Sequence, residues 1–177
     1  MKAVAFLRAV NVGGTGKIAM ADLRALAEEL GLGEPRTLLQ SGNLVFDAKG
    51  KTPKVLEALL EKELTARFDL KCRVMVRGAR QMKALAARNP FPKEAKNDPA
   101  RLHVFFLKDT ADAAAVAALN AAIKGRETAK GHGREVFLHY PDGMGESKLT
   151  NAVVERALSS PGTARNWNTV TKILELT

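Results

Sequence analysis

The sequence predicts an α+β fold in which two similar halves each run strand, helix, strand, strand, helix, strand. Three observations support this order. Some stretches carry apolar residues three or four positions apart, others carry alternating or continuous apolar residues, and glycine or proline separates the two kinds. The order βαββαβ is that of the ferredoxin-like fold, or α/β plait, an antiparallel sheet with helices on one face. Two such subdomains of roughly 85 residues, each with an extra C-terminal helix, fit a chain of 177 residues.

The first half supplies each element of this order in turn. A short apolar strand is followed by a glycine-rich loop and by a helix with one apolar face. Apolar runs on either side of Ser41-Gly42-Asn43 predict a tight hairpin or a bulged bend. Thr52 and Pro53 then begin a leucine-rich helix, and an alternating strand and a further helix complete the half. The expected strands are 2–9, 36–40, 44–46 and 70–76, the expected loop is 11–17, and the expected helices are 20–30, 53–68 and 79–88.

The second half repeats the order after a stretch that contains several prolines. Two of its strands flank Gly131-His132-Gly133, and Ser147 is expected to cap the helix that follows the turn 141–145. The expected strands are 102–107, 127–130, 135–140 and 162–166, and the expected helices are 111–123, one that begins at 147, and 167–176. We therefore expect subdomains at 1–90 and 101–177 and a linker at 91–100.

Composition limits the class of protein. The chain is 46% hydrophobic and 27% charged, and it lacks the run of about 18 apolar residues that a membrane span needs. We therefore expect no membrane segment. We also expect a cytoplasmic protein, since its single cysteine cannot form an internal disulfide. The net charge of +9 lies mostly in the first half, because residues 1–90 hold 16 Lys and Arg against 9 Asp and Glu. A basic surface permits binding of nucleic acid without requiring it.

Motifs for cofactors, metals and nucleophiles are weak. The glycines at 14 and 16 lie where a dinucleotide fingerprint belongs, but no acidic residue ends the next strand. Loop 13–17 also lacks the first glycine of a phosphate loop. Alternation of the strand 70–76 places Cys72 on its apolar face, as a structural thiol. The three histidines have no metal-ligating neighbours at useful spacing: His103, His132 and His139. We expect no metal and no cofactor.

Four polar, turn-forming clusters remain as candidate binding residues. Backbone N–H groups at helix starts, together with Lys or Arg, bind phosphate or carboxylate, whereas the same residue types also serve as helix caps and turns. Ser147-Lys148 is the sharpest case. The clusters are Arg8, Asn11, Gly13 and Gly14; Ser41, Gly42 and Asn43 after Gln40; Ser147, Lys148 and Thr150; and Arg165, Asn166 and Asn168.

A basic stretch between 71 and 88 has two interpretations. It contains no Asp or Glu, so it could line a nucleic-acid backbone or form a solvated positive face. The predicted strands hold few aromatic residues that could stack on bases. The basic residues are Lys71, Arg73, Arg77, Arg80, Lys83 and Arg88.

Several blocks, taken together and in order, resemble the bacterial family called domain of unknown function 1697. The resemblance covers nearly the whole chain. It implies two ferredoxin-like subdomains and assigns no activity and no catalytic residue. The blocks are 6–14 with Lys17, 20–23, 39–46, Asn89-Pro90-Phe91, Pro141-Asp142-Gly143, 147–150 and 165–170.

Three functions are compatible with these residues. The first is a non-catalytic binding protein for an anionic ligand, a nucleotide or nucleic acid, which uses the four clusters. The second is a small enzyme that acts on a phosphorylated or carboxylated substrate, with Lys148 as electrostatic stabiliser. The third is a protein-interaction module, which requires Trp167 and Phe91 to be exposed. The sequence does not indicate an oligomeric state.

Overall fold

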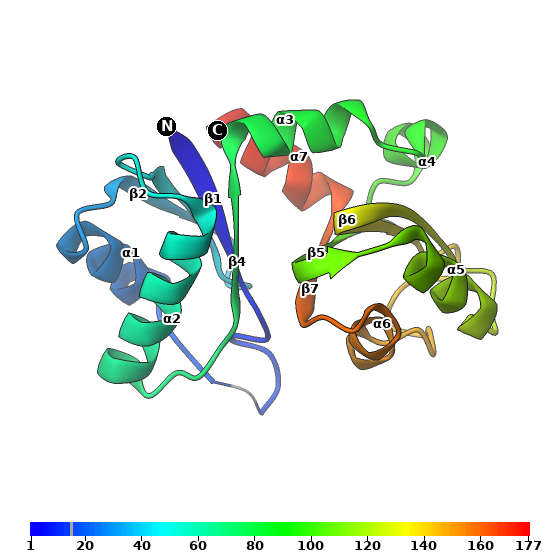
Figure 1. Ribbon diagram of the computed structural model, residues 1–177, viewed down its shortest axis with the longest axis horizontal. Helices are drawn as coiled ribbons and strands as arrows, with labels where there is room; N and C mark the ends of the chain where they lie inside the picture. The colour runs from blue at the N-terminus through cyan, green and yellow to red at the C-terminus, as the bar shows by residue number, and fades with distance from the viewer. Residues whose placement is uncertain (15) are drawn as a thin grey trace. The chain divides into compact units, whose positions relative to one another are not determined.

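The structure is a computed structural model that describes residues 1–14 and 16–177. Thr15, part of the expected loop 11–17, lies outside the described residues. The described chain has a mixed α+β fold with two antiparallel sheets, shown in Figure 1. It divides into a first unit, residues 1–84 with 173–177, and a second unit, residues 85–172.

The first unit contains one antiparallel sheet with the strand order β2-β3-β1-β4. Helices α1 and α2 lie on the same face of this sheet (Figure 1), where alternate residues of β1, namely Ala3, Ala5 and Leu7, join their leucines in one core. The elements are β1 (Lys2–Leu7), α1 (Met20–Glu29), β2 (Gly33–Leu38), β3 (Asn43–Asp47), α2 (Pro53–Phe68), β4 (Val74–Gly78) and α3 (Ala79–Ala87).

Local signals placed most of these elements correctly. Helix α2 begins at Pro53, as predicted, and the Thr52 hydroxyl accepts a hydrogen bond from the Val55 N–H at 3.4 Å. Strand β4 was predicted too early, because its regular pairing with β1 begins only at Val74. Cys72 lies before this strand and packs, partly buried, against the first core. Burial raises its pKa to about 11, so the thiol stays protonated near neutral pH.

Two glutamates of α2 cover the outer edge of the sheet at β4. An edge strand leaves alternate backbone N–H groups without a partner strand. Here the carboxylate of Glu61 accepts from the Val74 N–H and that of Glu57 accepts from the Val76 N–H, both at 2.9 Å. Glu57 also lies 3.9 Å from the Arg77 guanidinium, and both side chains are almost fully buried. One carboxylate therefore satisfies a strand amide and balances a buried charge.

Replacement of Glu57 by leucine is expected to lower the free energy of unfolding by about 3 kcal/mol, since it leaves a buried guanidinium and an edge N–H without this carboxylate. Urea denaturation followed by circular dichroism measures the change. Glu28→Leu, at an exposed position of α1, is the matched control and is expected to shift stability by less than about 0.5 kcal/mol. Equal effects of the two substitutions would contradict this role for Glu57.

The second unit contains an antiparallel sheet with the order β6-β5-β7 in the described chain. Helices α5 and α6 pack together over a core that includes Phe105, Val136 and Leu138. The Glu155 carboxylate of α6 accepts from the Gly162 N–H of the edge strand β7 at 2.8 Å, as the glutamates of α2 do at β4. The elements are α4 (Pro92–Asn97), β5 (Leu102–Ala111), α5 (Ala113–Ala122), β6 (Thr128–His139), α6 (Asn151–Leu158), β7 (Gly162–Asn166) and the first part of α7 (Trp167–Leu176), whose residues from 173 onward belong to the first unit.

The two strands expected on either side of Gly131-His132-Gly133 form one long strand, β6. Both glycines have positive φ, and the pairing register with β5 shifts near Gly133. A Cβ at Gly131 would lie 2.9 Å from the Glu135 carbonyl oxygen, so the glycine permits a close backbone approach inside the strand. The glycines therefore bend β6 where the sequence predicted a turn, and the described second unit runs βαβαβ.

Two further expectations differ from the structure. Residues 92–97 of the expected linker form the short helix α4. Ser147 does not cap α6; the Thr150 hydroxyl accepts from the Val153 N–H at 3.4 Å and begins that helix three residues later. Strand β7 and helix α7 are confirmed with the predicted bounds. Among the described residues, none of the helices has the length and apolar character needed to cross a bilayer.

His103 in β5 is buried without a hydrogen-bond partner for its Nδ1 among the described residues. Its ring packs edge-on against Tyr140, with the ring centroids 5.2 Å apart. Burial lowers the pKa of His103 below its ordinary value of 6.5. The folded protein therefore resists protonation at a pH where the unfolded chain already accepts a proton.

This difference predicts that the free energy of unfolding falls as pH drops below about 6.5, because the unfolded state then binds more protons than the folded one. Above that pH, His103 is neutral in both states and has no such effect. His103→Phe is expected to reduce the fall in the free energy of unfolding between neutral pH and pH 5. Urea denaturation at each pH measures this free energy. His132→Phe, at an exposed position, is expected to preserve the decline. An unchanged slope in His103→Phe would show that another group causes it.

Candidate functional site

The structure brings the first two predicted clusters together through the side chain of Asn11. Its Nδ2 donates to the carbonyl oxygens of Ile18 at 2.9 Å and Gln40 at 2.8 Å. Its Oδ1 accepts from the Ile18 N–H at 2.9 Å. One amide thus joins both ends of the loop after β1 to the turn between β2 and β3, and it is fully used within the fold.

The β2–β3 turn is likewise built by its own polar residues. Asn43 is buried, and its Nδ2 donates to the Leu38 carbonyl at 2.8 Å and to the Ser41 hydroxyl at 3.1 Å. The Gly42 carbonyl accepts from the Leu7 N–H at 2.9 Å. Gly42 has a φ of +77°, and a Cβ there would lie 2.8 Å from that of Leu7. Turn geometry and packing account for Ser41, Gly42 and Asn43.

The surface of this loop junction contains both apolar and polar groups. Gly13 and Gly14 are exposed, whereas Arg8 is half-buried. Val12 and Leu39 are each 52% exposed. Leu39 has a φ of +60°, a conformation that costs free energy for a residue with a bulky side chain. The junction therefore presents backbone, two apolar side chains and the exposed Lys17 and Gln40, and its two asparagines hydrogen-bond within the fold.

The fourth cluster lies at the join of β7 and α7. Arg165 is buried; it donates to the Thr163 hydroxyl at 2.7 Å and to the Ala164 carbonyl at 2.8 Å. Burial lowers its pKa to about 10, so it remains charged at neutral pH. The Asn166 side chain accepts from the Thr169 N–H at 3.0 Å and caps α7. Of this cluster, Asn168 is the exposed residue.

The aromatic anchors of the interaction-module hypothesis are buried. Trp167 is 8% exposed and Phe91 is 4% exposed. The Trp167 ring packs against Phe137, with centroids 6.1 Å apart, and the Lys130 ammonium lies 4.7 Å from the centre of the Phe91 ring. Neither aromatic residue offers the exposed surface on which that hypothesis depends.

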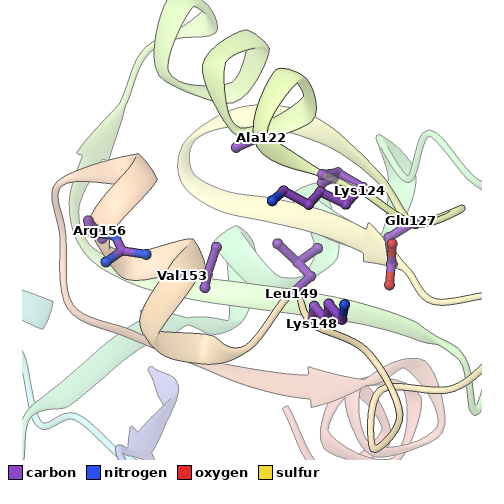
Figure 2. Close-up of a pocket in the computed structure, with 9 residues that line it drawn as sticks. Ala122, Lys124, Glu127, Lys148, Leu149, Val153 and Arg156 are labelled. Atoms are coloured by element: carbon purple, nitrogen blue, oxygen red, sulfur yellow. The ribbon is translucent and has the colours of Figure 1, made fainter.

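The third cluster borders a hollow of about 320 Å³ in the second unit (Figure 2). Its apolar lining includes Leu149 and Val153, and three exposed cations surround it. Figure 2 shows Lys124 at the end of α5, Arg156 on α6 and Lys148 on the loop between β6 and α6. Of the three residues predicted in this cluster, Lys148 is the one in the described lining of the hollow.

Hydrogen bonds fix the loop that carries Lys148. The Tyr140 hydroxyl donates to the Leu149 carbonyl at 3.1 Å, and the Leu149 N–H donates to the Ser147 hydroxyl oxygen at 3.0 Å. Ser147 in turn donates to the carboxylate of Glu127, which also lines the hollow. Ser147 therefore positions an acidic neighbour and orders the loop, rather than starting a helix.

The hollow carries a positive balance with an apolar floor. Three cations, Lys124, Lys148 and Arg156, face one carboxylate, Glu127, in its described lining. The nearby Arg126 is paired with Asp142 outside it. Such a site can hold a small organic molecule whose negative group meets the cations while its apolar part covers the floor. Lys124 and Arg156 were not among the predicted site residues, although Lys124 directly follows the predicted helix 111–123.

The basic stretch 71–88 does not present six available charges. Arg77 is buried beside Glu57, Arg73 lies 3.7 Å from a Glu61 oxygen, and Arg88 forms an ion pair with Glu135. The exposed remainder is Lys71, Arg80 and Lys83. Within residues 1–14 and 16–177, no group of three or more His, Cys, Asp or Glu is placed to hold a metal ion.

Comparisons with known proteins concern family and fold. A family model described as protein of unknown function (DUF1697) matches residues 1–137. The structure of a conserved bacterial protein, SP0830 from Streptococcus pneumoniae, is similar with a TM-score of 0.77 and 21% sequence identity. The similarity covers 99% of this chain and 97% of that chain, and at this identity it shows the fold alone. The curated proteins include no significant match.

Asn11→Asp is expected to lower the free energy of unfolding by about 2 kcal/mol, because aspartate keeps the acceptor but loses both donations and places a charge beside two carbonyl oxygens. Thermal or urea unfolding measures the loss. Asn168→Asp makes the same change at an exposed position and is expected to alter stability by less than about 0.5 kcal/mol. If Asn11→Asp were as stable as this control, the amide would not hold the loop junction together.

Proposed function

We propose that this chain, which belongs to the DUF1697 family of proteins of unknown function, binds a small organic anion. The anion is of mononucleotide size and lies in the hollow beside α5 and α6. The observation that carries the proposal is that three cations, Lys124, Lys148 and Arg156, line one hollow with an apolar floor. The hollow of about 320 Å³ lies within the size range of small-molecule sites, about 300–1,000 Å³.

The charge pattern favours a ligand with one compact anionic group. The three cations are exposed and come from three different segments, and among the described residues no ion pair holds any of them, so they are available to a phosphate or carboxylate. Glu127 is engaged by the Ser147 hydroxyl at one side of the hollow. The apolar side chains of Leu149 and Val153 suit the ring of a base or a short carbon chain.

A small anion is a better fit than a nucleic-acid strand. A strand requires a row of available cations along its phosphates. Three of the six basic residues between 71 and 88 are engaged by Glu57, Glu61 and Glu135. Arg165, which the sequence suggested as a phosphate contact, is buried. These placements favour a nucleotide over a polymer.

An enzyme acting on a phosphorylated or carboxylated substrate is the second candidate. The presence of Lys148 and a carboxylate, Glu127, in the lining of one hollow supports it, since a stabilising cation and a proton acceptor are what such a reaction needs. The described lining lacks Arg165, and Glu127 already accepts from Ser147. Binding without turnover therefore accounts for more of the geometry.

We further propose that both units follow the ferredoxin-like plan. The order βαββαβ and the sheet order β2-β3-β1-β4 in the first unit support this plan. In the second unit the bent strand β6 takes the place of two strands. Action in the cytoplasm likewise stays our proposal, based on the single cysteine of the sequence.

Titration calorimetry with AMP tests the binding proposal. The double substitution Lys148→Gln with Arg156→Gln is expected to weaken AMP binding at least tenfold, since each charge-assisted contact contributes about 1.5–3 kcal/mol. Adenosine, which lacks the phosphate, is expected to bind more weakly than AMP. Lys93→Gln with Lys96→Gln, which removes two exposed lysines of α4, is the charge-matched control and is expected to change the affinity less than about twofold.

Three outcomes would contradict the proposal: no AMP binding at about 10 mM, equal binding of adenosine and AMP, or an affinity that the double substitution leaves unchanged. Conversion of AMP to product in the same samples would favour the enzyme candidate. Loss of that turnover in Glu127→Gln, with AMP still bound, would assign the carboxylate to the chemistry.

A further inference from the structure

A second hollow, of about 360 Å³, lies in the first unit at the end of the sheet where β1 begins and β4 ends. Figure 1 shows the start of α2 and the start of α3 at this same end. Four segments contribute its lining: the start of β1, the turn after β3, the first turn of α2, and the junction of β4 and α3. The described lining falls entirely within residues 1–84, and it shares no residue with the hollow beside α5 and α6.

The charges of this second hollow are all positive. Its described lining contains Lys2, Lys51 and Arg80 and the chain's N-terminal residue, with no Asp or Glu. Lys2 pairs with Glu34 at 3.3 Å. Within the described part of the chain, no ion pair engages the side chains of Lys51 and Arg80. Two cations are therefore available to a ligand.

The N-terminal amine is not available to a ligand, because it pairs with Asp47. The amine donates to the Asp47 carboxylate at 2.9 Å, and the Lys49 N–H donates to the same oxygen at 3.0 Å. These hydrogen bonds lower the pKa of Asp47 to about 2, so the carboxylate is ionised at neutral pH. The amine is thus neutralised locally, and the available charge is that of Lys51 and Arg80.

The backbone around the hollow is also favourable to an anion. Helices α2 and α3 both begin there, and neither carries an acidic residue in its first turn. The partial positive charges at the two helix starts add to those of the side chains. The Gln81 side chain accepts from the Gly78 N–H at 2.9 Å, which fixes the start of α3 and the position of Arg80 next to it.

The floor of the hollow is apolar, which argues against a bare inorganic ion as the complete ligand. Ala3, Ala48 and Leu56 line it and are buried, whereas Met1, which is 69% exposed, and the half-buried Pro53 present apolar atoms that a ligand can cover. A ligand that covers this floor gains free energy from the apolar surface removed from water. The complete ligand therefore has an anionic end and an apolar part.

We infer that this hollow is a second anion site, which binds a phosphomonoester of a small apolar alcohol. Two available cations match the two negative charges of a phosphomonoester better than the single charge of a carboxylate. The planar Arg80 guanidinium can donate two hydrogen bonds to one phosphate, and Lys51 can contact it from the turn after β3. The first unit would then bind a ligand independently of the second.

Phenyl phosphate is a suitable probe, with inorganic phosphate and phenol as its two halves. Calorimetric titration of the full chain is expected to show phenyl phosphate binding more tightly than either half. Arg80→Gln with Lys51→Gln is expected to weaken phenyl phosphate binding at least tenfold. Lys62→Gln removes one charge at an exposed position later in α2 and is expected to leave the binding unchanged.

The Lys148→Gln and Arg156→Gln double variant separates the two hollows and is expected to bind phenyl phosphate as the unmodified protein does. The inference fails if this variant loses the binding, if Arg80→Gln with Lys51→Gln retains it, if phenol binds as tightly as phenyl phosphate, or if no probe binds at about 10 mM. Lys148 and Arg156 are both exposed at the first hollow. Circular dichroism is therefore expected to show that this double variant keeps its fold.

Discussion

The carboxylates of α2 hold the edge strand β4, and the organisation of the first unit depends on this contact. Glu57 joins helix, strand and the buried Arg77 at once, while Glu61 lies one helical turn further along and meets the strand two residues earlier. Four residues along a helix span about the same length as two residues along a strand. The two contacts therefore fix the position of α2 along β4. Glu155 and Gly162 make the corresponding contact between α6 and β7.

These helix-to-edge contacts determine where the two hollows form. Fixing α2 places its first turn beside the end of β4, where Arg80 and Lys51 meet an apolar floor. Fixing α6 places Val153 and Arg156 opposite the end of α5. Each hollow thus lies at helix ends, where side chains leave the packed core and cations reach solvent without losing their hydration.

Local chemistry made part of this structure predictable. Thr52 and Pro53 mark the start of α2, and β7 and α7 have the bounds that their residues predict. The glycines of β6 were misleading, because positive φ serves a bent strand as well as a turn. The hollows could not be predicted, since Lys2 and Arg80 line one hollow, and Lys124 and Arg156 the other, only through packing of distant segments. Asn11 was selected as a ligand contact, but its amide binds the protein's own backbone.

The division of the chain into units has a consequence for synthesis on the ribosome. Residues 173–177 belong to the first unit, although all of the second unit is translated between them and residue 84. The N-terminal half therefore emerges early with its sheet and two helices but without its final segment. Domains that are contiguous in sequence can complete folding while translation continues. Here the first unit reaches its full set of residues only after the second has been made, so the second unit can fold before the first is complete.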